Sequence, residues 1–342
     1  MSRPINIDGG FGFDGEFHDP TKLVKRAQEL EELGYDGLLV AEIAHEPFMP
    51  LAMAAMHTQR IELRTSIAVA LARSPMNLAN IGHDLNAYSK GRFVLGLGSQ
   101  IKPHITKRFS MPWHGPAKQM RECIAAMRAI WDCWYKGEQL NYVGEFYQHR
   151  LMTPEFTPTN TEYGAPPVLM AAVGPLMMAT AAAVADGIIV HSFCTEKHFK
   201  EVMLPLLETE LAKHSRTLDD FQVQFPVFIA SGETEEQLEK EKAAIKYRIG
   251  FYASTPAYKT VLDTHGWGDL QPHLNRMTKE GKWDQLPNEI SDEMLHAFAA
   301  VGEPLEVARQ IKNRFGGIID RAVLTPNVSP ETLEQQLSIL RA

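Results

Sequence analysis

Two side chains that can transfer protons follow a short apolar run near the start of the chain. Glu42 stands just after the run at 37–40, and His45 comes three residues later. A carboxylate at the end of a strand acts as a general base or accepts a hydrogen bond from a cofactor, and a histidine exchanges protons near neutral pH. Glu42 has no evident cationic partner in the sequence. A structural hydrogen bond is the alternative for both side chains.

A basic segment follows another apolar run, at 93–96. Its polar residues are Gln100, Lys102, His104, Lys107 and Arg108, and the chain as a whole carries a net charge of -8. Clustered cations on an acidic protein favour a phosphate or polycarboxylate ligand. A solvated loop face is the alternative interpretation.

A third candidate site lies where an apolar run at 167–170 gives way to a helical pattern. A proline at a helix start, with free backbone N–H groups beside it, makes a phosphate site. A plain strand-to-helix turn is the alternative, and the polar pair after the next apolar run favours the phosphate. The residues concerned are Ala172, Val173, Gly174, Pro175, His191 and Ser192.

Several classes of protein are disfavoured by the sequence. The three cysteines, Cys123, Cys133 and Cys194, show no CxxC spacing, and no HExxH or carboxylate–histidine cluster predicts a metal. No block of Lys and Arg predicts nucleic-acid binding. No apolar stretch approaches the roughly 20 residues of a membrane span, and no signal-peptide pattern opens the chain. We therefore expect a cytoplasmic protein with a small-molecule substrate.

Short β-rich runs alternate with longer helical patterns, which favours a parallel sheet with crossover helices. We predict strands at 5–7, 37–40, 61–69, 93–96, 167–170, 187–190, 221–230 and 321–324. We predict helices at 21–33, 47–56, 74–88, 116–135, 175–185, 196–213, 233–250, 305–314 and 330–340. A hairpin is expected at 140–149, and an irregular insertion from about 254 to 289.

Eight predicted strands with intervening helices fit an α/β fold of the (β/α)8 TIM-barrel type, with insertions at the C-terminal face. A doubly wound sheet is the alternative. We predict one domain over 1–342, with the insertion occupying about 251–300. Ligands of such barrels bind at the C-terminal ends of the strands, which is where the candidate residues above stand.

Several segments resemble a known family. They are 34–42, 72–79, 85–98, 172–175 and 185–187, and 89–98 carries the pattern Ser-x-Gly-Arg-Phe-x-x-Gly-x-Gly. These segments resemble the luciferase-like monooxygenase superfamily, over residues 1 to about 250 and about 300 to 342. The segment 99–110 resembles the coenzyme F420-dependent oxidoreductases within it.

The resemblance implies a barrel whose cofactor ring lies against a backbone bulge within Ser66 to Ala70, commonly with a non-prolyl cis peptide. It implies a phosphate site at 172–175 and near His191, and homodimers. From the strand ends and the resemblance together, we predict as cofactor-binding residues Ile67, Ala68, Val69, Gln100, Lys102, Ala172, Val173, Gly174, Pro175, His191 and Ser192. The chain departs from sugar-phosphate dehydrogenases and luciferases of this superfamily at Ile43, Ala44 and Ile101, where their functional residues stand.

The leading hypothesis is an F420-dependent oxidoreductase that transfers a hydride between the deazaflavin and a small alcohol, aldehyde or enone. Glu42 would contact the ring or the substrate, and His45 or His104 would exchange the proton. Phe11, Phe13 and Trp113 are candidates for the substrate wall, with core packing as their alternative. The other two hypotheses are an FMN-dependent monooxygenase and a flavin-binding barrel without catalysis.

Overall fold

The computed structural model describes residues 4–11, 17–324 and 328–342, so Phe13 lies outside the described residues. The chain divides into two compact units. The first unit comprises 8–189 and 210–222, and the second comprises 1–7, 190–209 and 223–342. None of the helices in the described residues is long and apolar enough to span a lipid bilayer.

The first unit is built on parallel strands in the order β1-β2-β3-β5-β8-β9, and β4 also pairs with β5. Their bounds are β1 Asn6–Gly10, β2 Gly37–Val40, β3 Glu62–Thr65, β4 Ala68–Val69, β5 Phe93–Gly98, β8 Val168–Ala172 and β9 Gly187–Val190. Strands β4, β5 and β9 are buried along their whole length, and the other four are buried at most of their positions, as parallel strands covered by helices are. The predicted strands are therefore confirmed in this unit, with one exception.

The exception is the predicted strand at 61–69, which the structure breaks into β3 and β4. A cis peptide joins Ser66 to Ile67 between them. The hydroxyl of Thr65 donates to the carbonyl oxygen of Gly96 and accepts from its N–H, both at 2.8 Å. The run is rich in β-branched residues and contains neither glycine nor proline, so its sequence gave no sign of this break.

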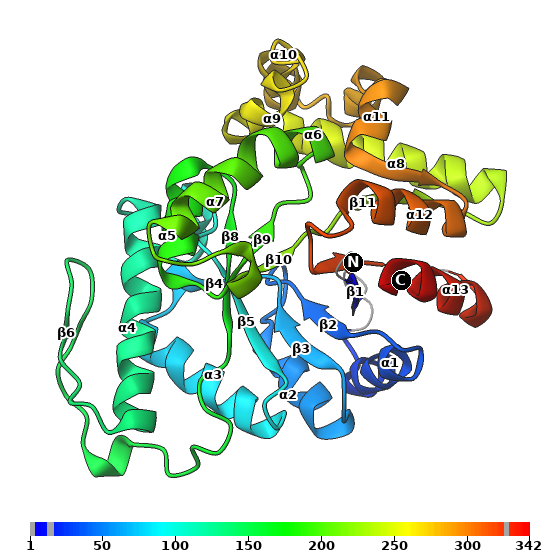
Figure 1. Cartoon of the computed structure of the whole chain (residues 1–342). Coiled ribbons are helices and arrows are strands. Elements are labelled where there is room, and N and C mark those ends of the chain that lie inside the picture. Colours follow the sequence, from blue (N-terminus) through cyan, green and yellow to red (C-terminus); the bar gives the residue numbers. More distant parts are fainter. Residues whose placement is uncertain (1–3, 12–16, 325–327) are drawn as a thin grey trace. The chain divides into compact units, whose positions relative to one another are not determined.

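Helices cover the strands of the first unit and pack against one another in chain order (Figure 1). They are α1 Pro20–Glu32, α2 Phe48–His57, α3 Pro75–Tyr88, α4 Pro116–Lys136 and α5 Pro175–Val184. Side chains cap two of them, since Asp19 accepts from the N–H of Thr21 and Ser74 from that of Asn77. The shorter elements are η1 Ala70–Ala72, the π-turn η2 His104–Arg108, η3 Pro154–Phe156, η5 Leu218–Asp220 and the predicted hairpin β6 Tyr142–Val143 with β7 Gln148–His149.

The second unit contains two parallel strand pairs, β10 with β13 and β11 with β12. Their bounds are β10 Gln222–Gln224, β11 Phe228–Ser231, β12 Ala299–Gly302 and β13 Arg321–Val323. The prediction of one strand over 221–230 was therefore wrong. Pro226 has no N–H for a strand ladder and falls between β10 and β11, which explains the break. The short strand β12 was not predicted.

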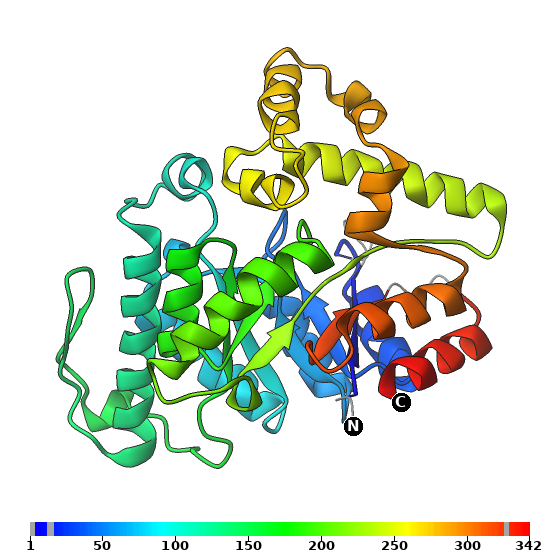
Figure 2. The same cartoon turned by 45° about the horizontal axis from the view of Figure 1, so that its top comes forward.

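Helices make up the rest of the second unit, where yellow and orange helices gather around α8 (Figure 2). They are α6 Glu196–His198, η4 Phe199–Met203, α7 Leu204–Ala212, α8 Glu235–Ala253, η6 Pro256–Tyr258, α9 Lys259–Asp263, α10 Leu270–Lys279, η7 Trp283–Glu289, α11 Asp292–Phe298, α12 Pro304–Phe315 and α13 Pro330–Arg341. The segment 254–289, expected to be irregular, is largely helical instead. Its apolar residues, such as Leu262, Leu274 and Leu286, are fully buried, which holds these short helices in place.

Candidate functional site

The strand registers of the first unit bring four chain segments to one edge. Val40 of β2 lies opposite Thr65, Val69 of β4 opposite Gly98, and Leu97 of β5 opposite Met170. The segments that follow these positions therefore emerge side by side at the carboxyl ends of the strands, where parallel α/β folds bind ligands. We call this edge the strand-end site; it comprises Glu42, 66–73, 98–100 and 171–175.

The bulge at the centre of the strand-end site is packed from below. Ile67 contacts the buried cluster of Val94, Leu169 and Ile189, and Ala171 packs against the same cluster. A Cβ atom at Gly98 would stand 2.9 Å from two side-chain atoms of Ile67, so any larger residue there would force Ile67 to shift. The non-prolyl cis peptide expected from the resemblance is present within the expected range, at Ser66–Ile67.

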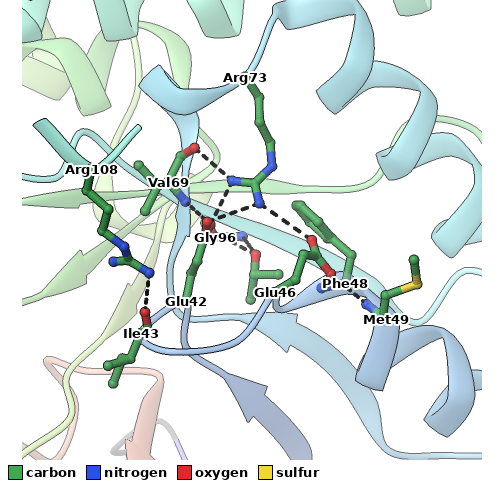
Figure 3. A network of polar contacts seen from close by, with 10 residues as sticks. Glu42, Ile43, Glu46, Phe48, Met49, Val69, Arg73, Gly96 and Arg108 are labelled. Carbon is green, nitrogen blue, oxygen red and sulfur yellow. Dashed lines mark hydrogen bonds and ion pairs between the residues drawn. The ribbon is translucent and has the colours of Figure 1, made fainter. Parts of the chain in front are cut away.

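Glu42 is held by a ring of donors from the same site (Figure 3). Its Oε2 accepts hydrogen bonds from the N–H of Val69 and from Nη1 of Arg73, both at 2.7 Å, and Oε1 accepts from Nη2 at 3.1 Å. The Glu42 side chain is 5% exposed and that of Arg73 16%. The carboxylate does have a cationic partner, which follows the next strand.

Two further contacts tie neighbouring loops to this network (Figure 3). Arg73 lies 3.5 Å from the carboxylate of Glu46, whose Oε2 accepts from the N–H groups of Phe48 and Met49 at the start of α2. Arg108 donates at 2.5 Å to the carbonyl oxygen of Ile43. The segment after β5 is thereby tied to the segment after β2.

The other two residues predicted to exchange protons have different surroundings. His45 is half-buried, and its ring stacks on Phe17 at 4.6 Å between centroids. Phe11 meets the same Phe17 edge to face at 5.7 Å, so the predicted substrate wall and His45 share one aromatic cluster. His104, by contrast, lies exposed on the π-turn η2.

The remaining predicted residues after β5 are accessible. Gln100 has a positive φ of 59°, and its side-chain oxygen accepts from the N–H of Ile101 at 2.9 Å. Lys102 and Lys107 are exposed, whereas Trp113 is half-buried. Among the residues that the structure describes, no ring contact joins Trp113 to the aromatic cluster of Phe11 and Phe17, so its role as substrate wall stays a prediction.

The start of α5 leaves backbone donors open. Gly174 is the N-cap residue, and among the described residues no side chain caps this helix. A Cβ atom at Gly174 would meet nothing within 4 Å, so the space in front of the helix is open. Ala172 is buried, Val173 and Gly174 are half-buried, and Pro175 is exposed. An uncapped N-terminus of this kind suits an anion.

His191, which follows β9, belongs to the second unit and has aromatic neighbours there. Its Nδ1 accepts from the N–H of Phe193 at 3.0 Å, so the ring proton sits on Nε2. Tyr258 stacks on the imidazole and Tyr252 meets it edge to face, each with centroids 4.7 Å away. Burial lowers the pKa of His191 to about 4 and raises the pKa of Tyr258 to about 12. Ser192 beside it is half-buried.

Three polar residues of these sites were not predicted from the sequence: Arg73, Tyr252 and Tyr258. Arg73 stood among the residues after the third strand, but it is 31 positions from Glu42, and no local pattern pairs them. The two tyrosines belong to α8 and to the insertion, for which no strand-end position was expected. One signal could have found Arg73. It is a cation that follows the predicted strand at 61–69, while the preceding strand is followed by Glu42, an acid with no partner nearby in the sequence.

Comparison with known proteins gives the family. The model of the luciferase-like monooxygenase family matches residues 8–321. An uncharacterized protein of Mycobacterium tuberculosis (strain ATCC 25618 / H37Rv) is 46% identical over 325 residues, which cover 94% of this chain and 93% of that protein. The 5,10-methylenetetrahydromethanopterin reductase of Archaeoglobus fulgidus is 26% identical over 326 residues, 93% of this chain and 92% of the reductase.

The fold has a solved counterpart. The coenzyme F420 dependent tetrahydromethanopterin reductase from Methanopyrus kandleri superposes with a TM-score of 0.78 at 20% identity, covering 100% of this chain and 99% of that chain. This likeness confirms the predicted (β/α)8 barrel and excludes the doubly wound alternative. With the family model spanning residues 8–321, the chain belongs to the luciferase-like monooxygenase family.

Proposed function

We propose that the protein is an F420-dependent oxidoreductase that transfers a hydride between the deazaflavin and a small organic substrate. Relatives that span nearly the whole chain include a reductase at 26% identity, and the fold is shared with a reductase described as coenzyme F420 dependent. When bound, the deazaflavin supplies the hydride chemistry itself, and the protein binds, orients and handles protons.

The single observation that carries the proposal is the strand-end site of the first unit. There a fixed bulge at 67–69 lies beside the glycine-containing end of β5 and the uncapped start of α5. A bulge of fixed backbone, together with an uncapped helix start, fits a ring that carries a phosphate. We assign the ring to Ile67, Ala68 and Val69.

The anionic part of the cofactor has donors of two kinds in this site. The uncapped start of α5, after the segment 172–175, suits the phosphate, because the positive end of the helix dipole adds to the backbone N–H groups of its first turn. Gln100 and the exposed Lys102 stand at the end of β5 and suit the carboxylates of a longer tail. In the second unit we assign to the cofactor the uncharged Nε2–H of His191, and with it Ser192.

The substrate side rests on the aromatic cluster after β1 and β2. Phe11 and His45 both contact Phe17, which holds the imidazole beside an apolar surface. We propose that His45 exchanges the substrate proton and that Phe11, with Trp113, excludes water from it. His104 is the second candidate for the proton, from its exposed position on η2.

Cofactor binding followed by turnover tests the proposal. Purified protein is titrated with F420 and separately with FMN, and the affinity is measured by cofactor fluorescence. The proposal expects F420 to bind and its absorbance to change with an alcohol, aldehyde or enone. Binding of FMN alone, together with oxygen consumption, would overturn it.

The second candidate is an FMN-dependent monooxygenase, which the family description favours. It requires a pocket that shields an oxygenated flavin from water. The same titration separates the two functions, because only the monooxygenase consumes oxygen. Binding without turnover across the substrate panel would instead support a barrel that only sequesters its cofactor.

A further inference from the structure

The carboxylate of Glu42 has little capacity left for chemistry of its own. Its two oxygens together accept three hydrogen bonds, from Val69 and from two nitrogens of Arg73 (Figure 3). The side chain is only 5% exposed. Protonation would break the ion pair and leave the guanidinium of Arg73, itself 16% exposed, without this partner. A group in these surroundings is poorly suited to exchange a proton in every turnover.

The same two residues also hold the backbone of the bulge. The N–H of Glu42 donates to the carbonyl oxygen of Ile67 at 3.0 Å. The N–H of Val69 donates to Glu42, and the carbonyl oxygen of Val69 accepts from Arg73 at 3.0 Å. Three polar backbone groups of the segment 67–69 are therefore satisfied by Glu42 and Arg73.

We propose that Glu42 and Arg73 are positioning residues, a charged clamp that fixes the backbone of 67–69 for the cofactor, and that Glu42 carries no proton in the reaction. The clamp exists in the protein without ligand, whereas its effect on the cofactor rests on the proposed function. The clamp replaces the direct role expected for Glu42 from the sequence alone.

Hydrogen exchange in the ligand-free protein tests the clamp itself. We compare the peptide covering residues 66–72 in the parent, Glu42→Gln, Arg73→Met and Arg73→Lys, by mass spectrometry. The proposal expects exchange to rise about ten-fold in Glu42→Gln and in Arg73→Met, with part of the protection regained in Arg73→Lys, which keeps a cation. Exchange at parental rates in both Glu42→Gln and Arg73→Met would overturn it.

Glu46→Gln is the matched control, because Glu46 is the other carboxylate near Arg73 but is 43% exposed and 3.5 Å away. It is expected to leave the peptide within about two-fold of the parent. An increase equal to that of Glu42→Gln would overturn the clamp, since the effect would then be general to charge loss around Arg73.

Cofactor affinity and the pH profile test the role in the reaction. The dissociation constant for F420 is expected to rise about ten-fold in both Glu42→Gln and Arg73→Met, while the pH dependence of kcat keeps the parental shape in each. Loss of one limb of the profile in Glu42→Gln, with the limb kept in Arg73→Met, would show that Glu42 carries the proton. If F420 bound to none of these proteins, the proposed function would fail while the exchange experiment still decided the clamp.

Discussion

Two polar clusters of the molecule hold their central side chains by different interactions. In the first unit, Glu42 and Arg73 form a buried ion pair with hydrogen bonds to the backbone. In the second unit, the rings of Tyr252 and Tyr258 pack against His191, whose Nδ1 accepts a hydrogen bond from the N–H of Phe193. One cluster depends on charge, and the other on the absence of charge.

The two clusters therefore tolerate different changes. A buried ion pair fixes backbone positions closely, but loss of either partner leaves a charge in a poorly solvated place. An aromatic cluster keeps its imidazole neutral by excluding water, so it tolerates loss of a contact more easily and fails when protons are added. The predictions that follow test this contrast, in order of expected effect.

Gly96→Ala is expected to have the largest effect. Gly96 lies in β5, which pairs with β4, and Val69 of β4 donates a hydrogen bond to Glu42 of the first cluster. A Cβ atom there would overlap the carbonyl oxygen of Thr65 and stand 2.8 Å from Ile189. We expect a loss of unfolding free energy above about 4 kcal/mol, or no folded protein. Gly115→Ala is the control, since its Cβ would meet nothing within 4 Å, and it should cost about 1 kcal/mol or less in urea unfolding.

Arg73→Met is expected to cost about 3 kcal/mol, because it leaves the carboxylate of Glu42 buried without its partner. Urea unfolding measures the change. Adding Glu42→Gln to Arg73→Met should recover part of the loss, because the double variant no longer buries a lone charge. A double variant that is less stable by the full sum of the two single losses would contradict the assigned ion pair.

Acid is expected to act on the second cluster. Burial lowers the pKa of His191 to about 4, whereas histidine in an unfolded chain has a pKa of about 6.5. Between these values the unfolded chain binds more protons, so stability present above pH 6.5 is lost as the pH falls, by about 2 kcal/mol at pH 5.

His191→Phe keeps an aromatic ring and removes this share of the acid loss, as urea unfolding at pH 5 and pH 7.5 would measure. Burial also lowers the pKa of His198 and His265, so part of the loss remains. His104→Gln, at an exposed histidine, should keep the parental loss. An unchanged acid loss in His191→Phe would contradict the neutral imidazole.

Glu46→Gln is expected to have the smallest effect on stability, about 0.5 kcal/mol. Its ion pair with Arg73 is long and its side chain is 43% exposed, and glutamine still accepts from the N–H groups of Phe48 and Met49. Thermal unfolding at low and high salt measures it. A loss matching that of Arg73→Met would mean that the outer carboxylate, not Glu42, balances the guanidinium.

Most elements of the first unit were predicted because the residues at their ends and within them carry local signals. Pro75 and Pro116 open helices, Gly137 closes one with a φ of 71°, and buried apolar runs form the strands. The insertion was not predicted in this way, because α9 and α10 are short and gain their stability from buried contacts with distant residues.

The candidate site was predictable in position but not in its pairing. Glu42, the bulge and the start of α5 were predicted because each follows a strand, and the carboxyl ends of parallel strands lie at the same edge. The link between Glu42 and Arg73 and the rings around His191 depend on which strand lies beside which, information that spacing along one chain does not contain. The role that we propose for Glu42 therefore rests on partners that only the structure shows.

The bond from Arg108 to residue 43 has a consequence for specificity. The guanidinium of Arg108 donates to the main-chain oxygen of Ile43, while the isoleucine side chain is 53% exposed. A hydrogen bond to a main-chain oxygen does not depend on which side chain the residue carries, because every residue has this oxygen. Position 43 can therefore carry a different side chain without loss of the hydrogen bond that fixes this loop.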